Sequence, residues 1–526
     1  MKEMVNFIDT TTRDGAQSNW ASGMPIGMMA EIINDVDKAG YAVIDAPFVP
    51  VNFKKYTRDL RENPWEMVKL YGKTKTPKAI MSQASTDLWE MWAIPRSMVE
   101  LFHQLLVDYG ALQRVQVMGN VYGDIGYDWY IPMIKKLGLE LNFALCYYIS
   151  PRHQMEGYWK KKTKFMASYK PDLMYLKDAG GLLDIDSIRG VWPILEKYSN
   201  GVPLELHGHC TTGLADVVYV EAMKLGCRAF HVATPPMAEG TAQPSVFNIA
   251  DNAKRLGYEV NLDLERIERI SKRIYSMAKQ MGKEDALRAV GKFPLPTDFG
   301  PTRFNVYHYK HKIPGGVISN TIHQLNELHI KSQISEVIEE VIKISEETGY
   351  PHLITPYSQF VCTQAALNIA SGERYKVVID EMIKVAMGQF NEDSGYLDMD
   401  QNLKDKFLNL PRAKHIKEIW KDAKENVQHL SLKEVRNKLN AVNLSDEDFM
   451  LRFMMNGTKE IDTMNKVTMK RNGIMKFSAS ETPIQELINT LLNETKITNI
   501  QVKSPNGSLI LKKNHSVLQK TPVTSD

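Results

Sequence analysis

The chain has 526 residues, with 65 Lys and Arg against 62 Asp and Glu, which leaves a formal charge of +3. This length predicts about two to four domains, and the near-neutral charge gives no reason to expect nucleic acid as a partner. Its four cysteines lack a Cys-x-x-Cys spacing, which argues against a disulfide scaffold and a thiolate zinc site. Because the start has no signal-like apolar run and no stretch has membrane-spanning length, we expect a cytoplasmic protein.

Short β-rich runs alternate with longer amphipathic stretches through the first half of the chain. Eight such strand–helix units predict a (β/α)8 TIM barrel over residues 1–258. An open doubly wound sheet is the alternative, but no Gly-x-Gly-x-x-Gly motif follows the first strand. The predicted strands are Val5–Asp9, Tyr41–Asp45, Lys78–Met81, Val115–Met118, Glu140–Tyr147, Leu173–Lys177, Leu204–His207 and Ala229–Ala233. The predicted helices are Gly27–Ala39, Arg96–Tyr109, Gln154–Tyr169, Ile185–Lys197, Ala215–Leu225 and Val246–Leu256.

Helical periodicity dominates the second half and predicts a mainly α-helical, funnel-like domain over residues 259–470. Within it, residues 294–316 are rich in Pro and Gly and are expected to form loops. The helical stretches are Asp263–Lys283, Ile322–Thr348, Val378–Gly388 and Leu403–Asn440.

Residues 471–526 differ from both preceding parts and predict a short accessory segment. It begins with an amphipathic helix, Pro483–Glu494. Thr498–Lys503 and Ser508–Lys513 then flank a Pro-Asn-Gly turn signal, which predicts a hairpin. The polar tail after His515 is expected to be disordered.

Groups able to bind a metal follow several predicted strands at the end where such barrels carry their active sites. The first strand leads into DTTTRDGAQS, which contains Arg13 and Asp14. His207 and His209 are two residues apart in the seventh strand, so both imidazoles face one side and can reach one ion. Lys177 ends the sixth strand, where it could act as a base, a Schiff-base nucleophile or a carbamate.

Each of these features alone also has a purely structural interpretation. Arg13 and Asp14 can form a structural ion pair, and the histidines can hydrogen-bond each other. Lys177 can form a salt bridge to Asp178 or Asp14. Their convergence at one barrel end favours a metal site.

At these residues the sequence resembles the carboxyltransferase subunits of biotin-dependent carboxylases and decarboxylases. That family includes the oxaloacetate decarboxylase α subunit, the carboxyltransferase domain of pyruvate carboxylase and a transcarboxylase subunit. The matching segments keep their order over about residues 5–376. They are DTTTRDGAQS, NPWE, SPRHQMEGY, LKDAGGLL, LHGHCTTGLA, GTAQPS, PGGVISN, TPYSQFVCTQAALN and GERY.

The resemblance implies a divalent metal such as zinc, manganese or cobalt, held by Asp14, His207, His209 and a CO2-derived carbamate on Lys177. It implies that Ser319 carries a proton between biotin and the enolate of the substrate. The implied catalytic residues are Lys177, Ser319, Gln17 and Arg13. The implied cofactor-binding residues are Gln17, Ser319, Gly240 and Gln243.

The resemblance further implies carboxyl transfer between carboxybiotin and a small organic acid, such as the 2-oxo acids pyruvate and oxaloacetate. The tail resembles the helix and hairpin that precede biotin carrier modules, but no Ala-Met-Lys-Met follows. Biotin is therefore expected on a separate biotin carboxyl carrier protein, with a biotin carboxylase or a membrane decarboxylase subunit as a further partner. A homo-oligomer is implied as well.

Two departures from the family pattern bear on the substrate. Ser82 stands nearest the position of a carboxylate-binding Arg, and Ala46–Pro50 replaces a Trp-Gly-Gly segment. The acceptor acid and the direction of transfer therefore stay open. Two other functions also stay open: a metal-dependent acyl-CoA lyase or aldol-type synthase of the related barrel superfamily, and a non-catalytic assembly subunit.

Overall fold

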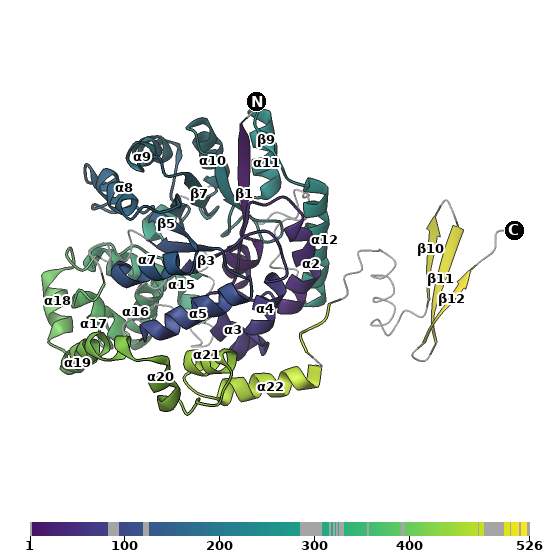
Figure 1. The fold of residues 1–526 in the computed structure, drawn as a ribbon. Coiled ribbons are helices and arrows are strands. Elements are labelled where there is room, and N and C mark those ends of the chain that lie inside the picture. The colour runs from purple at the N-terminus through teal and green to yellow at the C-terminus, as the bar shows by residue number, and fades with distance from the viewer. Residues whose placement is uncertain are drawn as a thin grey trace.

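Eight parallel strands close into a barrel, as the alternating pattern predicts (Figure 1). The computed structural model describes residues 3–82, 94–118, 126–283, 308–314, 317, 318, 321, 325, 331–354, 357–390, 395–471, 473–477, 499–504, 507–514 and 517–522. Strand β1 pairs with both β2 and β8, which closes the sheet. The strands are β1 Met4–Asp9, β2 Val43–Asp45, β3 Lys78–Ser82, β4 Arg114–Met118, β5 Glu140–Cys146, β6 Leu173–Asp178, β7 Leu204–Gly208 and β8 Ala229–Val232. Each lies within two residues of its predicted bounds.

Amphipathic helices surround the barrel and bury their apolar faces against it (Figure 1). The predicted helices are confirmed as α2 Ile26–Asp37, α5 Arg96–Asp108, α8 Tyr158–Ser168, α9 Ile185–Tyr198, α10 Ala215–Lys224 and α11 Val246–Arg255. The sequence analysis missed α1 Ala16–Trp20, α3 Pro50–Lys55, the π-helical turn η2 Tyr56–Leu60, α4 Pro64–Tyr71 and α7 Tyr127–Lys136.

Helix α4 shows how the local sequence determines where one of these missed helices begins. The Asn63 side chain accepts a hydrogen bond from the Trp65 N–H at 3.1 Å, and Pro64 occupies the first helical position. Both are favourable signals for a helix start. The NPWE segment is therefore a helix start, which its short length concealed.

The second half of the chain forms helices, as its periodicity predicts, but with shorter segments. The predicted helical stretch Leu403–Asn440 is confirmed but divided, because Pro411 begins a new helix and a Ser431–Glu434 capping box begins another. The elements are β9 Glu259–Val260, α12 Leu264–Gln280, α13 His308–His311, α15 Ile334–Glu347, α16 Tyr357–Ser371, α17 Asp380–Ala386, α18 Gln401–Leu408, α19 Pro411–Glu425, α20 Leu432–Lys438, α21 Asp446–Met455 and α22 Lys459–Arg471.

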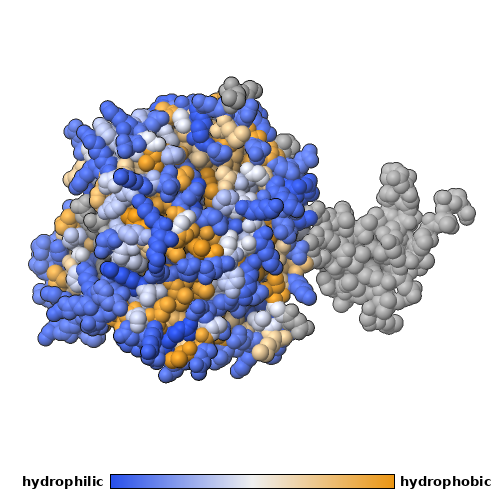
Figure 2. All heavy atoms as spheres, in the orientation of Figure 1, coloured by the Kyte–Doolittle hydropathy of each residue, from blue (hydrophilic) through white to orange (hydrophobic). Residues whose placement is uncertain are grey.

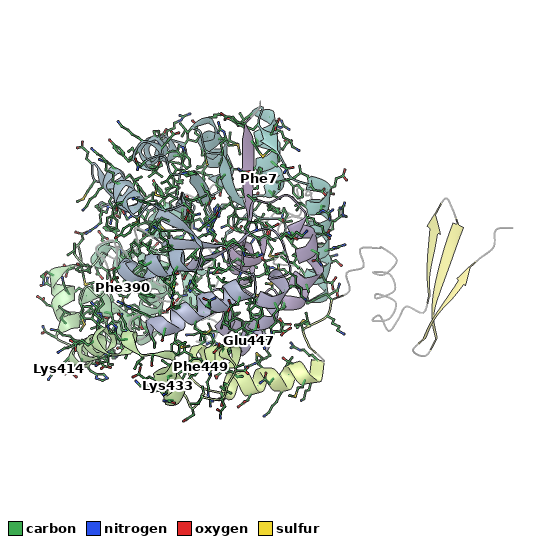
Figure 3. All side chains as sticks on the ribbon, viewed as in Figure 1. Phe7, Phe390, Lys414, Lys433, Glu447 and Phe449 are labelled. Atoms are coloured by element: carbon green, nitrogen blue, oxygen red, sulfur yellow. The ribbon has the colours of Figure 1, made fainter. Side chains whose placement is uncertain are left out.

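These later helices pack directly on the outer helices of the barrel. Helix α12 lies against α2, where Arg266 and Arg273 both pair with Asp35. At another point, the buried Trp65 ring donates from Nε1 to the Glu447 backbone oxygen in α21 at 3.0 Å. Figure 3 labels Glu447 at this contact between α21 and the barrel helices. In the view of Figure 2, hydrophilic residues lie mainly around the outline of the molecule, and hydrophobic residues lie between them nearer the centre.

The C-terminal hairpin is confirmed and belongs to a separate three-stranded antiparallel sheet. Strands β10 Asn499–Ser504 and β11 Gly507–Asn514 pair with Ser504 opposite Gly507. A third strand, β12 Val517–Pro522, pairs with β11 where we expected disorder. The expectation was wrong because β11 offers a free edge to a tail that contains the β-branched Val517 and Thr521. The predicted helix Pro483–Glu494 lies outside the described residues.

No helix within the described ranges is long and apolar enough to span a bilayer.

Candidate metal centre

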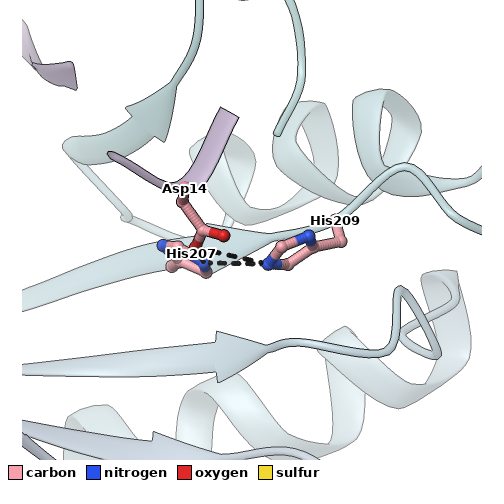
Figure 4. A group of neighbouring side chains, drawn as sticks. All are labelled: Asp14, His207 and His209. Carbon is pink, nitrogen blue, oxygen red and sulfur yellow. Dashed lines mark hydrogen bonds and ion pairs between the residues drawn. The ribbon is translucent and has the colours of Figure 1, made fainter. Parts of the chain in front are cut away.

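Two barrel strands bring metal-ligating side chains together at one end of the barrel. Directly after β1 the chain winds into a π-helical turn, Thr11–Gly15, which carries Asp14. His207 lies in β7, and His209 follows two residues later. Asp14 Oδ2 is 3.1 Å from His207 Nε2 and 3.5 Å from His209 Nε2, and the two Nε2 atoms are 3.3 Å apart (Figure 4). All three residues are buried.

The hydrogen bonds of the histidines determine which ring nitrogen offers a lone pair. His209 Nδ1 lies 2.7 Å from the Thr241 backbone oxygen, which can only accept, so Nδ1 carries the proton. His231 Nε2 is 3.2 Å from the Glu205 carboxylate and donates to it. With a neutral ring, His231 Nδ1 then accepts from His207 Nδ1–H at 3.1 Å. Both Nε2 atoms of the cluster therefore carry lone pairs.

The hydrogen-bonded residues His231 and His207 form a histidine chain inside the barrel, and Glu205 anchors it. Its Oε1 accepts from Arg114 Nη1 at 2.8 Å, and its Oε2 accepts from Asn142 Nδ2 at 2.9 Å. Burial favours the neutral acid, but His231, Arg114 and Asn142 outweigh it and hold the pKa of Glu205 below its ordinary value. The sequence analysis missed Glu205 and His231, although Glu205 shares the inward side of β7 with His207 at a spacing of two residues.

Arg13 keeps Asp14 in its charged form. Arg13 Nη1 lies 3.1 Å from Asp14 Oδ2, and Arg13 Nε donates to Asp45 Oδ2 at 2.7 Å. Burial favours the neutral carboxyl, but the Arg13 charge holds the pKa of Asp14 well below its ordinary value. Arg13 and Asp14 therefore form the structural ion pair that we considered, and this same pair supplies a carboxylate to the cluster.

The donor set fits a divalent transition metal. A carboxylate oxygen and two imidazole lone pairs, which are ligands that such a metal accepts, face one another at 3.1 to 3.5 Å. Metal–nitrogen and metal–oxygen bonds of about 2.0–2.1 Å would separate neighbouring ligands by about 3.0 to 3.4 Å. The Gln243 side-chain amide can donate to either imidazole lone pair, because its Nε2 lies 3.0 Å from His209 Nε2 and 3.3 Å from His207 Nε2.

Lys177 stands beside this cluster on the neighbouring strand. It is paired in register with His207 across β6 and β7 and is 4% exposed. Burial, reinforced by the Arg13 charge, lowers the pKa of Lys177. Asp178 instead accepts the backbone N–H groups of Leu182 and Leu183 at 2.8 and 2.7 Å. Within the described ranges, Lys177 forms no ion pair with Asp178 or Asp14.

The remaining predicted residues lie at different places. Gln17 follows Asp14 by three residues, and its Oε1 is buried without a hydrogen-bond partner in the described part of the chain. Gly240 adopts φ +62°, a conformation that favours glycine. Ser82 Oγ accepts from the Tyr130 hydroxyl at 2.5 Å. Ser319 lies outside the described residues.

The chain is similar to several known carboxylase and carboxyltransferase proteins. The model of a family described as "Conserved carboxylase domain" matches residues 308–497. The chain is 31% identical over 402 residues to a pyruvate carboxylase subunit of Methanocaldococcus jannaschii, covering 74% of this chain and 66% of that protein. It is 26% identical over 391 residues to the methylmalonyl-CoA carboxyltransferase 5S subunit of Propionibacterium freudenreichii, covering 73% of each.

A solved structure has the same fold. It is the carboxyl transferase domain of Rhizobium etli pyruvate carboxylase with pyruvate, which matches with a TM-score of 0.68 at 18% identity, covering 97% of this chain and 84% of that one. Among the curated relatives, the matched region spans only about two thirds of the length of two pyruvate carboxylase subunits, at 66% and 64%. The match therefore concerns the carboxyltransferase part of such proteins.

Proposed function

Because this chain belongs to the carboxyltransferase family of biotin-dependent carboxylases, we propose that it transfers a carboxyl group between carboxybiotin and a small organic acid. The observation that supports this most directly is the cluster of Asp14, His207 and His209 beside Lys177 at the barrel mouth. The family match over residues 308–497 further supports this function. That region follows the barrel, and a lyase built on the barrel alone would not explain the match.

We assign Asp14, His207 and His209 as the ligands of a divalent metal, with Lys177 as a fourth. A metal bound there would supply Lewis acidity that polarises the oxygens of the acid substrate. Arg13 holds Asp14 charged, and Thr241 and His231 hold the two imidazoles with Nε2 free. The lowered pKa of Lys177 increases the neutral amine, which can add to CO2 and form a carbamate.

The other assignments concern the transfer itself. Gln17 follows Asp14 by three residues and has a buried amide oxygen without a hydrogen-bond partner in the described part of the chain, which suits a contact with substrate or biotin. Ser319 is assigned as the proton carrier between biotin and the substrate, because a hydroxyl both donates and accepts. Gly240 and Gln243, which lie in the loop after β8, are assigned to binding of the biotin cofactor.

The acceptor and the partners are part of the same proposal. A separate biotin carboxyl carrier protein would deliver carboxybiotin, and a biotin carboxylase or decarboxylase subunit would complete the reaction. The relatives are named for pyruvate and for methylmalonyl-CoA. Ser82, with its neutral hydroxyl held by Tyr130, offers no fork of donors for a carboxylate. We therefore expect another donor to hold the acid.

The test is biotin-dependent decarboxylation by the purified chain. Oxaloacetate and methylmalonyl-CoA are supplied separately with free biotin, and the decarboxylated product is measured with and without a chelator. We expect biotin to accelerate release from one of them and the chelator to abolish the acceleration. His209→Ala serves as the metal-ligand control. If biotin accelerates neither reaction and no biotinylated protein co-purifies with the native complex, the proposed function is wrong.

A further inference from the structure

A second group of potential metal ligands lies beside the first centre and shares no side chain with it. Cys210 directly follows His209, Asp216 lies in the first turn of α10, and Glu239 lies in the loop after β8. One ligand atom from each of these residues lies within 4.8 Å of the other two. Cys210 is buried and the two acids are half-buried, so the group lies within the protein and keeps contact with solvent.

The hydrogen bonds around the two acids leave one Asp216 oxygen without a donor, whereas Glu239 also accepts a hydrogen bond from the Cys210 thiol. Asn248 Nδ2 donates to Asp216 Oδ2 at 3.1 Å and to Glu239 Oε1 at 3.2 Å. The backbone N–H of Ser245 donates to the same Glu239 oxygen at 2.9 Å. Asp216 Oδ1 is buried and accepts no hydrogen bond from any described residue. Donors that fix one oxygen of a carboxylate and leave the other available are typical of residues that orient metal ligands.

The charges of this group also lack a counter-ion. In the described part of the chain, no ion pair joins Asp216 or Glu239 to a cationic side chain. A bound cation would occupy the position where the two carboxyl groups and the Cys210 thiol come together.

We propose that Cys210, Asp216 and Glu239 bind a second divalent transition-metal ion. The thiol disfavours Mg²⁺ and Ca²⁺, whereas Zn²⁺ and Co²⁺ accept sulfur and carboxylate oxygen together. On binding, the Cys210 thiol releases its proton to solvent and coordinates as the thiolate. This proposal does not depend on the proposed function, because none of its ligands belongs to the first centre.

The second ion would hold together the loops after β7 and β8, which also support the first metal centre. Cys210 N–H donates to the Ala242 oxygen at 2.8 Å, and Glu239 N–H donates to the Gln243 oxygen at 2.8 Å. These loops also carry His209 and Thr241, whose contact orients one imidazole of the first cluster. A metal that links Cys210 to Glu239 would therefore hold that imidazole in place.

The test is a titration of the chelator-treated full chain with Co²⁺. Thiolate coordination gives a sulfur-to-cobalt charge-transfer absorption, which the nitrogen and oxygen ligands of the first centre do not produce. We expect two bound ions per chain and a charge-transfer band. His209→Ala, which disables the first centre, should keep the band, whereas Cys210→Ser should lose it. Cys146→Ser and Cys227→Ser are controls that should keep it, because these buried cysteines lie outside the group.

A second variant keeps the test valid even if Cys210→Ser fails to fold. Glu239→Gln retains the thiol and the shape of the side chain, and we expect binding of the second ion to weaken by at least about tenfold, as loss of a charged ligand predicts. Circular dichroism checks the fold of each variant. A single bound ion without a band in the unmutated chain overturns the proposal, and so does a band that persists in folded Cys210→Ser.

Discussion

Replacing Glu205 by Gln tests whether the buried His231–His207 chain sets the metal affinity of the first centre. The change keeps the shape of the side chain and removes its charge, while His231, Arg114 and Asn142 lose a charged acceptor. A hydrogen bond to a charged group contributes about 1.5–3 kcal/mol and one between neutral groups about 0.5–1.5 kcal/mol. The difference of about 1–1.5 kcal/mol corresponds to about tenfold weaker metal binding.

The assay measures Co²⁺ or Zn²⁺ affinity by competition with a chelator, and separately measures thermal unfolding of the metal-free protein. Glu140→Gln is the matched control, because Glu140 Oε2 accepts from the same Arg114 at 2.8 Å but half of its side chain is exposed. It should leave metal affinity unchanged and lower stability by less than about 1 kcal/mol. If Glu205→Gln binds metal as tightly as the unmutated chain, or if Glu140→Gln weakens binding equally, the histidine chain does not set the affinity.

Three further predictions concern other parts of the molecule. Lys177→Arg should abolish carboxyl transfer and the carbamate signal seen by ¹³C NMR with labelled CO2, since a guanidinium stays protonated; retained activity would exclude the carbamate. Ser319→Ala should block transfer while Co²⁺ affinity stays unchanged; a normal transfer rate would remove Ser319 from the proton path. Trp65→Phe should lower the free energy of unfolding by about 1 kcal/mol through loss of the Nε1–Glu447 hydrogen bond, measured by urea denaturation; no change would mean that this bond does not hold α21.

The sequence predicted the barrel well because its signal is local and repeated. Buried parallel strands such as Arg114–Met118 are short and rich in apolar and β-branched residues, and the helices between them carry an amphipathic pattern. Elements too short to show that pattern clearly escaped notice, among them the eight-residue α4 and the five-residue turn Thr11–Gly15. Helix α16 was also missed, because its buried positions lie around most of its circumference and give little amphipathic contrast.

The site was predictable only where spacing along one strand determines geometry. His207 lies in β7 and His209 is the first residue after it, so the spacing of two residues predicts their common direction. Glu205 lies on the same side of β7, yet its partners Arg114, Asn142 and His231 come from three other strands. The barrel register alone brings them together. The same holds for Cys210, Asp216 and Glu239, which the sequence presents as unrelated residues.

The packing of α21 and the segment after α22 on the barrel has a consequence for the order of folding. Trp65 meets Glu447 across 382 residues of sequence, and the Glu62 carboxylate accepts the Met475 backbone N–H across 413 residues. Contacts of such long separation form late, because a large loop must close first. The apolar helix face around Trp65 therefore stays partly uncovered during synthesis until the residues up to Met475 have been made. Such transiently exposed apolar surface makes a partly synthesised chain prone to aggregation.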